Sequence, residues 1–192
     1  MYYVKAVKGD LTELGNCNLM GAFASAGGGG DSGSWTERAN VTLDGAASTI
    51  DSSTFTTDNN IMFSAFIKAV TTTGNIEMRL NADADANYCY RGFTNGGTSF
   101  SATAQNEARI HDDSGTELEF YIQGFIYNIA GSEKLILTQS CQNTGAGTGA
   151  TLTQCLITNK WVNTAAQCNQ ITILPANNTI DTGSNLTVWT AS

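Results

Sequence analysis

Apolar and polar residues alternate in short runs from Trp35 onward, and clusters of Gly, Asn, Asp, Ser and Thr interrupt these runs about every 8 to 14 residues. This spacing is typical of an all-β fold, because successive side chains of a strand point to opposite faces of a sheet. The pattern predicts ten strands, at 35–43, 60–70, 75–81, 87–93, 108–110, 118–129, 134–142, 151–161, 170–174 and 186–190. We therefore expect a jelly-roll-like antiparallel β-sandwich.

The run at 118–129 is apolar on both of its faces. Phe120, Ile122 and Ile126 share one face of the expected strand, and an aromatic set that includes Tyr121 and Phe125 shares the other. We expect the first face to pack on the opposing sheet. The aromatic face is expected to meet a neighbouring subunit or a loop.

Residues 1–34 differ from the rest of the chain. A weakly apolar stretch at 11–23 is followed by a glycine-rich segment at 26–33, which is typical of a flexible tether. No Gly-Lys-Ser/Thr follows the four glycines, so we do not expect a phosphate-binding loop. The sequence predicts an N-terminal arm and tether at 1–34, for attachment or assembly, and a β-sandwich domain at 35–192. The start of the chain lacks an apolar segment behind basic residues, so no secretion signal is expected.

Composition supports an all-β chain and excludes several classes of protein. Only 14% of the 192 residues are charged, and the formal net charge is −8. Thr suits a pleated surface, whereas Asn, Ser and Gly suit turns. The acidic balance argues against a nucleic-acid partner, and the absence of a long apolar run argues against a membrane span.

Five cysteines are present, Cys17, Cys89, Cys141, Cys155 and Cys168. Their odd number leaves at least one thiol unpaired within a chain, and no C-x-x-C pair suggests zinc or redox chemistry. Most of them lie in or beside apolar runs, where a cysteine behaves as a small hydrophobe. We favour reduced, buried thiols over a disulfide framework.

Residues that would indicate catalysis are sparse. The single histidine, His111, precedes Asp112 and Asp113 in an expected turn, so turn formation explains these residues better than a Ser-His-Asp triad. Pairs among carboxylates such as Glu77, Glu117 and Glu119 occur by chance in any chain with 17 acidic residues, so they do not predict a glycosidase. We assign no catalytic residue and do not expect an enzyme.

Asn81, Asp83, Asp85 and Asn87 place an oxygen-bearing side chain at every second position, as in the opening of an EF-hand loop. Counted from Asn81, however, the sixth position is alanine and the twelfth is glycine, where that loop requires glycine and glutamate. The segment is therefore interpreted either as a calcium site or as a polar connection between two strands. We expect no other cofactor.

Five aromatic residues are candidates for a glycan-binding or interface surface, namely Tyr88, Tyr90, Phe93, Trp161 and Trp189. Aromatic residues of a small β-sandwich more often lie in its core. The core is the favoured alternative here, because aliphatic core residues are somewhat sparse in this chain.

Segment 78–91 reads Met-Arg-Leu-Asn-Ala-Asp-Ala-Asp-Ala-Asn-Tyr-Cys-Tyr-Arg and is followed at 94–97 by Thr-Asn-Gly-Gly. It resembles a segment of uncharacterised virion-associated proteins of tailed viruses of bacteria and archaea, especially marine ones. Further similar segments lie at 131–137, 143–147, 160–163, 170–174 and 182–189, so the resemblance covers roughly 47–191. Residues 1–34 do not take part in it.

The resemblance implies a β-sandwich displayed on a virus particle as a head decoration, fibre or tail-tip protein. Other virion proteins would be its partners, and analogy with viral fibres favours a homotrimer. The low charge and the many Thr, Asn and Gly residues also favour packing between copies. The alternative function is a lectin-like module that recognises host-surface glycans, either on a virion or as a secreted protein.

Overall fold

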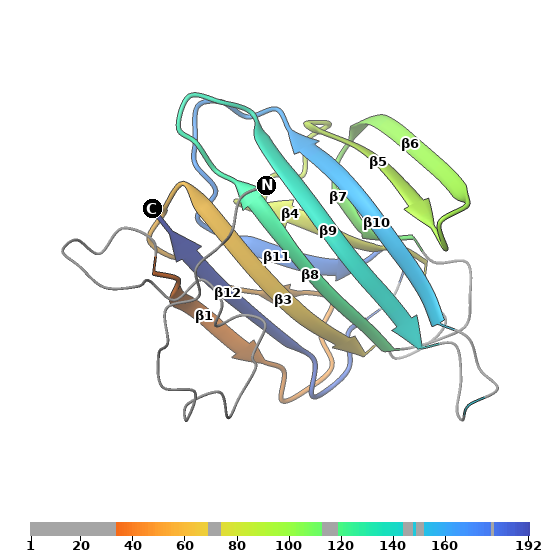
Figure 1. Ribbon diagram of the computed structural model, residues 1–192. Helices are drawn as coiled ribbons and strands as arrows, with labels where there is room; N and C mark the ends of the chain where they lie inside the picture. Colours follow the sequence, from red (N-terminus) through yellow and green to blue (C-terminus); the bar gives the residue numbers. More distant parts are fainter. Residues whose placement is uncertain (1–33, 69–73, 113–118, 144–147, 149–151, 178) are drawn as a thin grey trace, which may run out of the picture. The chain divides into compact units, whose positions relative to one another are not determined.

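A computed structural model describes residues 34–68, 74–112, 119–143, 148, 152–177 and 179–192. The described chain is all-β and folds as a sandwich of an eight-stranded and a four-stranded antiparallel sheet (Figure 1). This confirms the predicted fold class. The sandwich belongs to a compact unit that comprises Trp35–Ser192. The predicted arm and tether lie outside the described residues, apart from Ser34.

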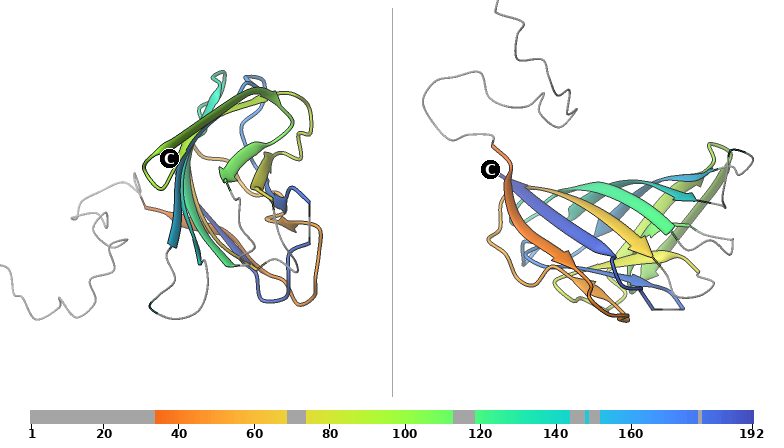
Figure 2. Two further views of the ribbon diagram at one scale, coloured as in Figure 1. Left: turned by 90° about the vertical axis from the view of Figure 1, so that its right-hand side faces the viewer. Right: turned by 90° about the horizontal axis from the view of Figure 1, so that it is seen from below.

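The large sheet has eight strands, with the two ends of the sandwich chain on neighbouring strands at one edge. Their order is β1 (Thr36–Thr42), β12 (Asn185–Ala191), β3 (Asn60–Lys68), β8 (Glu119–Tyr127), β9 (Lys134–Asn143), β10 (Leu152–Trp161), β5 (Tyr88–Thr94) and β6 (Thr98–Gln105). The small sheet covers one face of the large sheet, as the edge-on view of Figure 2 shows. Its order is β2 (Ile50–Asp51), β11 (Ile171–Pro175), β4 (Ile76–Leu80) and β7 (Ala108–His111).

All ten predicted strands are present, and the structure adds β2 and β6. Strand β6 is the second strand of a hairpin whose turn contains Asn95 and Gly96, with φ of 51° and 71°. Two consecutive residues with positive φ are characteristic of the type I′ turn, which matches the twist of a hairpin. The prediction treated this Asn-Gly pair only as a break between strands. Strand β2 has two residues and gives no detectable alternation.

The core lies between the two sheets and is formed by the inward-facing residues of nearly every strand. In β8, Phe120, Ile122 and Ile126 are at most 1% exposed, as the alternation predicts. Gly124 occupies the same face, and the ring of Phe63 fills the space that a side chain would need. A Cβ at Gly124 would lie 2.6 Å from that ring and 2.9 Å from a backbone oxygen of β9. Strand β8 therefore requires glycine here.

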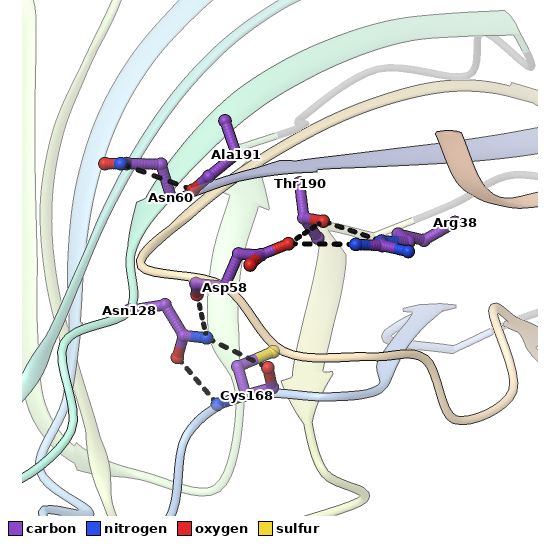
Figure 3. Close-up of polar contacts among 7 residues, drawn as sticks. All are labelled: Arg38, Asp58, Asn60, Asn128, Cys168, Thr190 and Ala191. Atoms are coloured by element: carbon purple, nitrogen blue, oxygen red, sulfur yellow. Dashed lines mark hydrogen bonds and ion pairs between the residues drawn. The ribbon is translucent and has the colours of Figure 1, made fainter. Parts of the chain in front are cut away.

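Asn128, directly after β8, joins its own segment to the segments at Asp58 and Cys168 (Figure 3). Its buried amide nitrogen donates to the carbonyl oxygens of Asp58 at 2.9 Å and Cys168 at 3.0 Å. Its amide oxygen accepts a 2.6 Å hydrogen bond from the backbone nitrogen of Cys168. The amide therefore satisfies backbone groups that no strand pairing reaches.

A second polar cluster joins β1, β12 and the segment before β3 (Figure 3). The guanidinium of Arg38 donates to Thr190 Oγ1 at 2.8 Å and to Asp58 Oδ2 at 3.1 Å. The Thr190 hydroxyl donates to the same Asp58 oxygen at 2.5 Å. The hydrogen bond from Thr190, reinforced by Arg38 and opposed by partial burial, lowers the pKa of Asp58. These contacts fasten the edge strand β1 to the body of the sandwich.

Candidate functional site

Asp83 organises the 81–87 segment, which was predicted from the sequence as a candidate calcium site. Its carboxylate accepts hydrogen bonds from Trp161 Nε1 at 2.6 Å, Asn87 Nδ2 at 2.9 Å and the backbone nitrogen of Asp85 at 2.9 Å. Partial burial opposes ionisation, but these three bonds together hold the pKa of Asp83 below its ordinary value. The carboxylate thus anchors a connection between β4 and β5.

The side chain of Asn81 points to a different part of the chain. Its amide nitrogen donates to the Gln167 carbonyl and its amide oxygen accepts from the Asn169 backbone nitrogen, at 2.9 and 2.8 Å. Within the described ranges, no group of three or more His, Cys, Asp or Glu side chains could hold a metal ion. The four predicted side chains therefore do not converge on one point, and calcium binding at Asn81, Asp83, Asp85 and Asn87 stays a prediction.

The five aromatic candidates lie in three different environments. Tyr88 and Trp161 are in the core, stacked with ring centroids 6.4 Å apart. The Tyr88 hydroxyl accepts a 2.9 Å hydrogen bond from the Leu80 backbone nitrogen, and burial raises the pKa of this hydroxyl. Tyr90 packs against Phe100 and beneath the Arg109 guanidinium, 4.9 Å from its ring centroid.

The other two aromatic candidates, Phe93 and Trp189, lie on the outer face of the large sheet, where Phe93 is exposed and Trp189 is half-buried. The structure therefore does not gather the five predicted aromatic residues into one surface.

His111 is not in a turn, contrary to the prediction, because it ends strand β7 and is completely buried. Its Nδ1 lies 2.8 Å from Ser140 Oγ and its Nε2 lies 3.3 Å from Gln142 Oε1. A serine and a histidine are thus within hydrogen-bond distance, as nucleophilic catalysis requires. Ser140, however, is only 2% exposed, so a substrate does not reach its hydroxyl in this conformation. The cluster satisfies buried polar groups between the sheets.

Ion pairs cluster on β4 and β7 of the small sheet. Arg109 contacts Asp112 at 2.8 Å and Glu77 at 3.8 Å, and Arg79 contacts Glu107 at 2.5 Å. Burial, together with the neighbouring charge of Glu107, raises the pKa of Glu77. Glu77 and Glu119 belong to different sheets and do not form a catalytic pair. Glu117 and Asp113 lie outside the described residues.

The most extensive unusual feature is the outer face of the large sheet. Among the described residues, nine of the ten exposed large hydrophobic side chains belong to it, and we call this set the outer apolar face. Its members are Phe66, Phe93, Tyr121, Phe125, Tyr127, Leu135, Leu137, Leu152 and Leu156. They are between 38% and 64% exposed. The tenth such side chain, Val162, follows β10 outside the strands.

Strand register places members of the outer apolar face side by side, in rows that Ser64, Gln123 and Gln139 separate on β3, β8 and β9. It pairs Phe66 with Tyr121, Phe125 with Leu137, Tyr127 with Leu135 and Leu156 with Phe93 across neighbouring strands. The ring of Trp35, just before β1, lies against Phe125 with centroids 6.3 Å apart and adds to this face. The sequence prediction detected its aromatic part in the run at 118–129. It missed the leucines of β9 and β10, because these two runs were predicted only as strands, without an assigned outward face.

A hollow of about 430 Å³ lies at the β5 end of the outer apolar face. Phe93, Leu135 and Leu156 contribute apolar walls, and Arg91 and Lys160 add positive charge. Lys160 is paired with Glu133 at 3.0 Å, whereas Arg91 is exposed and has no ion-pair partner among the described residues. An apolar hollow beside a cation suits a ligand with an apolar body and a negative group.

The four described cysteines are free thiols. Cys155 and Cys168 are buried, as expected, and burial raises the pKa of Cys168 to about 12. Cys89 and Cys141 are only half-buried, because both point to the outer side of the large sheet. The prediction of buried thiols is therefore wrong for these two. Cys17 lies outside the described residues.

Comparison with protein-family models, with curated proteins and with solved structures found no significant match to this chain. The resemblance to virion-associated proteins therefore stays a prediction. No helix in the described part of the chain is long and apolar enough to cross a membrane.

Proposed function

We propose that this chain is a structural subunit of a virus particle, in which the β-sandwich is displayed as part of a head decoration, fibre or tail tip. The outer apolar face supports this proposal. Monomeric proteins rarely expose a contiguous apolar patch larger than a few hundred Å², and larger patches mark contacts with other proteins. A subunit that works by packing against other subunits needs such a face, together with a rigid body that holds it flat.

Charge distribution also supports contacts with other proteins. The eight strands of the large sheet contain two of the chain's 17 carboxylates, Glu37 and Glu119. Most carboxylates of the described residues therefore lie outside the strands of this sheet. Packing of a further subunit on the outer face would bring few like charges together, and repulsion between like charges is a main obstacle to assembly of an acidic protein.

An antibody raised against the purified chain tests the virion role. Virus particles are purified on a density gradient from the organism or sample whose genome encodes the chain. We expect the antibody to detect the chain in the same gradient fractions as the DNA of the particles. Antibody absorbed beforehand with purified chain is the control. If the chain is found only in the fractions that lack particles, the proposed function is wrong.

A glycan-binding module is the second candidate, favoured by the hollow that Phe93 and Arg91 line. In this function an exposed aromatic ring packs on a sugar face, and the guanidinium binds an acidic group of the glycan. A glycan microarray that includes acidic glycans tests this candidate. Binding that Phe93→Ala and Arg91→Ala both remove, and that Val162→Ala keeps, would favour it over a purely structural role.

A further inference from the structure

We infer that the outer apolar face is the surface on which a second copy of this chain packs, sheet against sheet, around a two-fold axis that runs parallel to the strands between β8 and β9. This inference rests on the proposed structural role, and it deepens that role by naming a second copy of the chain as the partner of the outer apolar face. The view of Figure 1 looks onto this face, with β8 and β9 near its middle.

The exposed apolar area is sufficient for a stable pair. Nine side chains, each of about 200 Å² and about half exposed, present on the order of 900 Å² of apolar surface per copy. A standard stable interface buries about 800 Å² per partner, and the largest patch on a typical monomer is about 300–600 Å². The half-buried Trp189 and the ring of Trp35 lie on the same side of the sheet and add to this area.

The apolar residues are distributed evenly about the centre of the sheet. Strands β8 and β9 are the fourth and fifth of eight, and they carry five of the nine members of the outer apolar face. A two-fold axis between them places Phe125 opposite Leu137 of the second copy and Tyr127 opposite Leu135 of the second copy, since these are register partners within one sheet. Two twisted sheets that pack face to face in this way form an aligned sandwich, with an angle of about −30°.

Charges at the two ends of the sheet are complementary under the same axis. One row of register partners runs from Glu37 on β1 through the apolar centre to Arg91 on β5 and Ser101 on β6. The axis reverses this row, so Glu37 lies opposite Ser101 of the second copy, one strand from Arg91. Both Glu37 and Arg91 are exposed. The two ends of the interface would each gain an acidic and a basic group.

The charge pair provides a test that intramolecular effects cannot mimic. Glu37 and Arg91 lie on strands six positions apart in the sheet, which is about 29 Å at the usual strand spacing. A measurable coupling between them can therefore arise only between copies. We expect Glu37→Arg and Arg91→Glu each to raise the dissociation constant by about 3- to 10-fold, and the double variant to return to near the wild-type value.

Light scattering of the full chain over a range of concentrations is the main measurement. We expect twice the chain mass of 20.3 kDa for the wild type. Leu137→Arg should raise the dissociation constant at least 100-fold, because it buries an unpaired charge at the centre of the interface. Val162→Arg is the matched control, since Val162 is 39% exposed but lies off the outer apolar face. Circular dichroism of each variant checks that the sandwich is intact.

Several outcomes would overturn the inference. A wild-type dimer that Leu137→Arg leaves intact would place the interface elsewhere, and a trimer, as the viral-fibre analogy predicts, would exclude the two-fold axis. A monomeric wild type that dimerises after deletion of residues 1–33 would show that the chain's own N-terminal segment occupies the face in the full chain. A dimer that is absent from particles refutes the virion role alone, whereas a monomer found in particles refutes the pairing alone.

Discussion

Asn128→Asp isolates the contribution of one buried amide, because it changes the shape of the side chain very little. The amide nitrogen of Asn128 donates to two backbone carbonyls, those of Asp58 and Cys168. A carboxylate has no hydrogen to donate, so both carbonyls lose their donor and face a negative charge instead. The bond accepted from the Cys168 backbone nitrogen is retained.

The expected loss follows from these two bonds. A buried polar group that loses its partner costs about 1–3 kcal/mol, so two carbonyls cost about 2–6 kcal/mol at neutral pH. Asn128 is fully buried, so solvent does not replace the lost bonds. The free energy of unfolding of a domain is typically about 5–15 kcal/mol, so the loss is a large fraction of it and is readily measured.

The loss should depend on pH with a defined sign. Burial raises the pKa of an aspartate at position 128 above its unfolded value of about 3.9. Below that value the carboxyl is protonated in both states, and its O–H restores one of the two donor bonds. As pH rises toward the folded-state pKa, the unfolded state ionises first, so the penalty relative to wild type increases.

Urea unfolding of the variant and the wild type at pH 4 and pH 7 measures this penalty. Asn40→Asp is the matched control, because Asn40 is exposed and uses only its amide oxygen, which accepts from Asn185. We expect the control to change stability by no more than about 0.5 kcal/mol. A loss for Asn128→Asp that equals the control, or that is the same at both pH values, would refute the reasoning.

Four further experiments test other parts of the fold. Gly124→Ala should destabilise the sandwich by roughly 1–3 kcal/mol in urea unfolding, because its Cβ overlaps Phe63, and adding Phe63→Leu should recover part of the loss. Asp83→Asn should lower the unfolding midpoint more at pH 7 than at pH 2, because the lowered pKa of Asp83 gives stability that is present above about pH 4 and decreases on acidification. Added calcium should leave the wild-type midpoint unchanged relative to EDTA, since the Asp83 carboxylate already accepts three hydrogen bonds. A rise in the midpoint would instead support the calcium hypothesis. Iodoacetamide at pH 8, followed by mass spectrometry, should leave Cys155 and Cys168 unmodified until urea unfolds the chain, and rapid labelling of either would contradict their burial.

Strand positions were predictable because alternation along a strand reports burial directly. In β8 and β9 every second residue is buried, so the period was visible without knowledge of partners. Strand β6 was missed because Phe100 is its only large apolar residue, and the rest are Thr, Ser, Ala and Gln. Its hairpin geometry depends on the turn at Asn95 and Gly96. This Asn-Gly pair indicates a hairpin more clearly than the residues of β6 indicate a strand.

The candidate site was less predictable, since its contacts join residues far apart in sequence. No residue near Asp83 in the sequence indicates that the indole of Trp161, 78 residues later, donates a hydrogen bond to its carboxylate. The burial of His111 likewise depends on Ser140 and Gln142 from a strand of the opposite sheet. The outer apolar face was partly visible at 118–129 because one strand was apolar on both faces. Its full extent required the order of the strands.

The pairing of β1 with β12 determines how the sandwich would respond to mechanical load. Thr36 at the start of β1 is the register partner of Thr190 near the end of β12, so tension applied through the two ends of the sandwich pulls two adjacent strand ends apart. Hydrogen bonds of an antiparallel pair lie across the strands, and such tension breaks them one after another instead of all together. Strand β1 would peel away first, beginning at the contacts of Arg38 with Thr190 and Asp58. The other seven strands of the large sheet would meanwhile keep their pairing, so loss of the edge strand alone would relieve the tension on the rest of the domain.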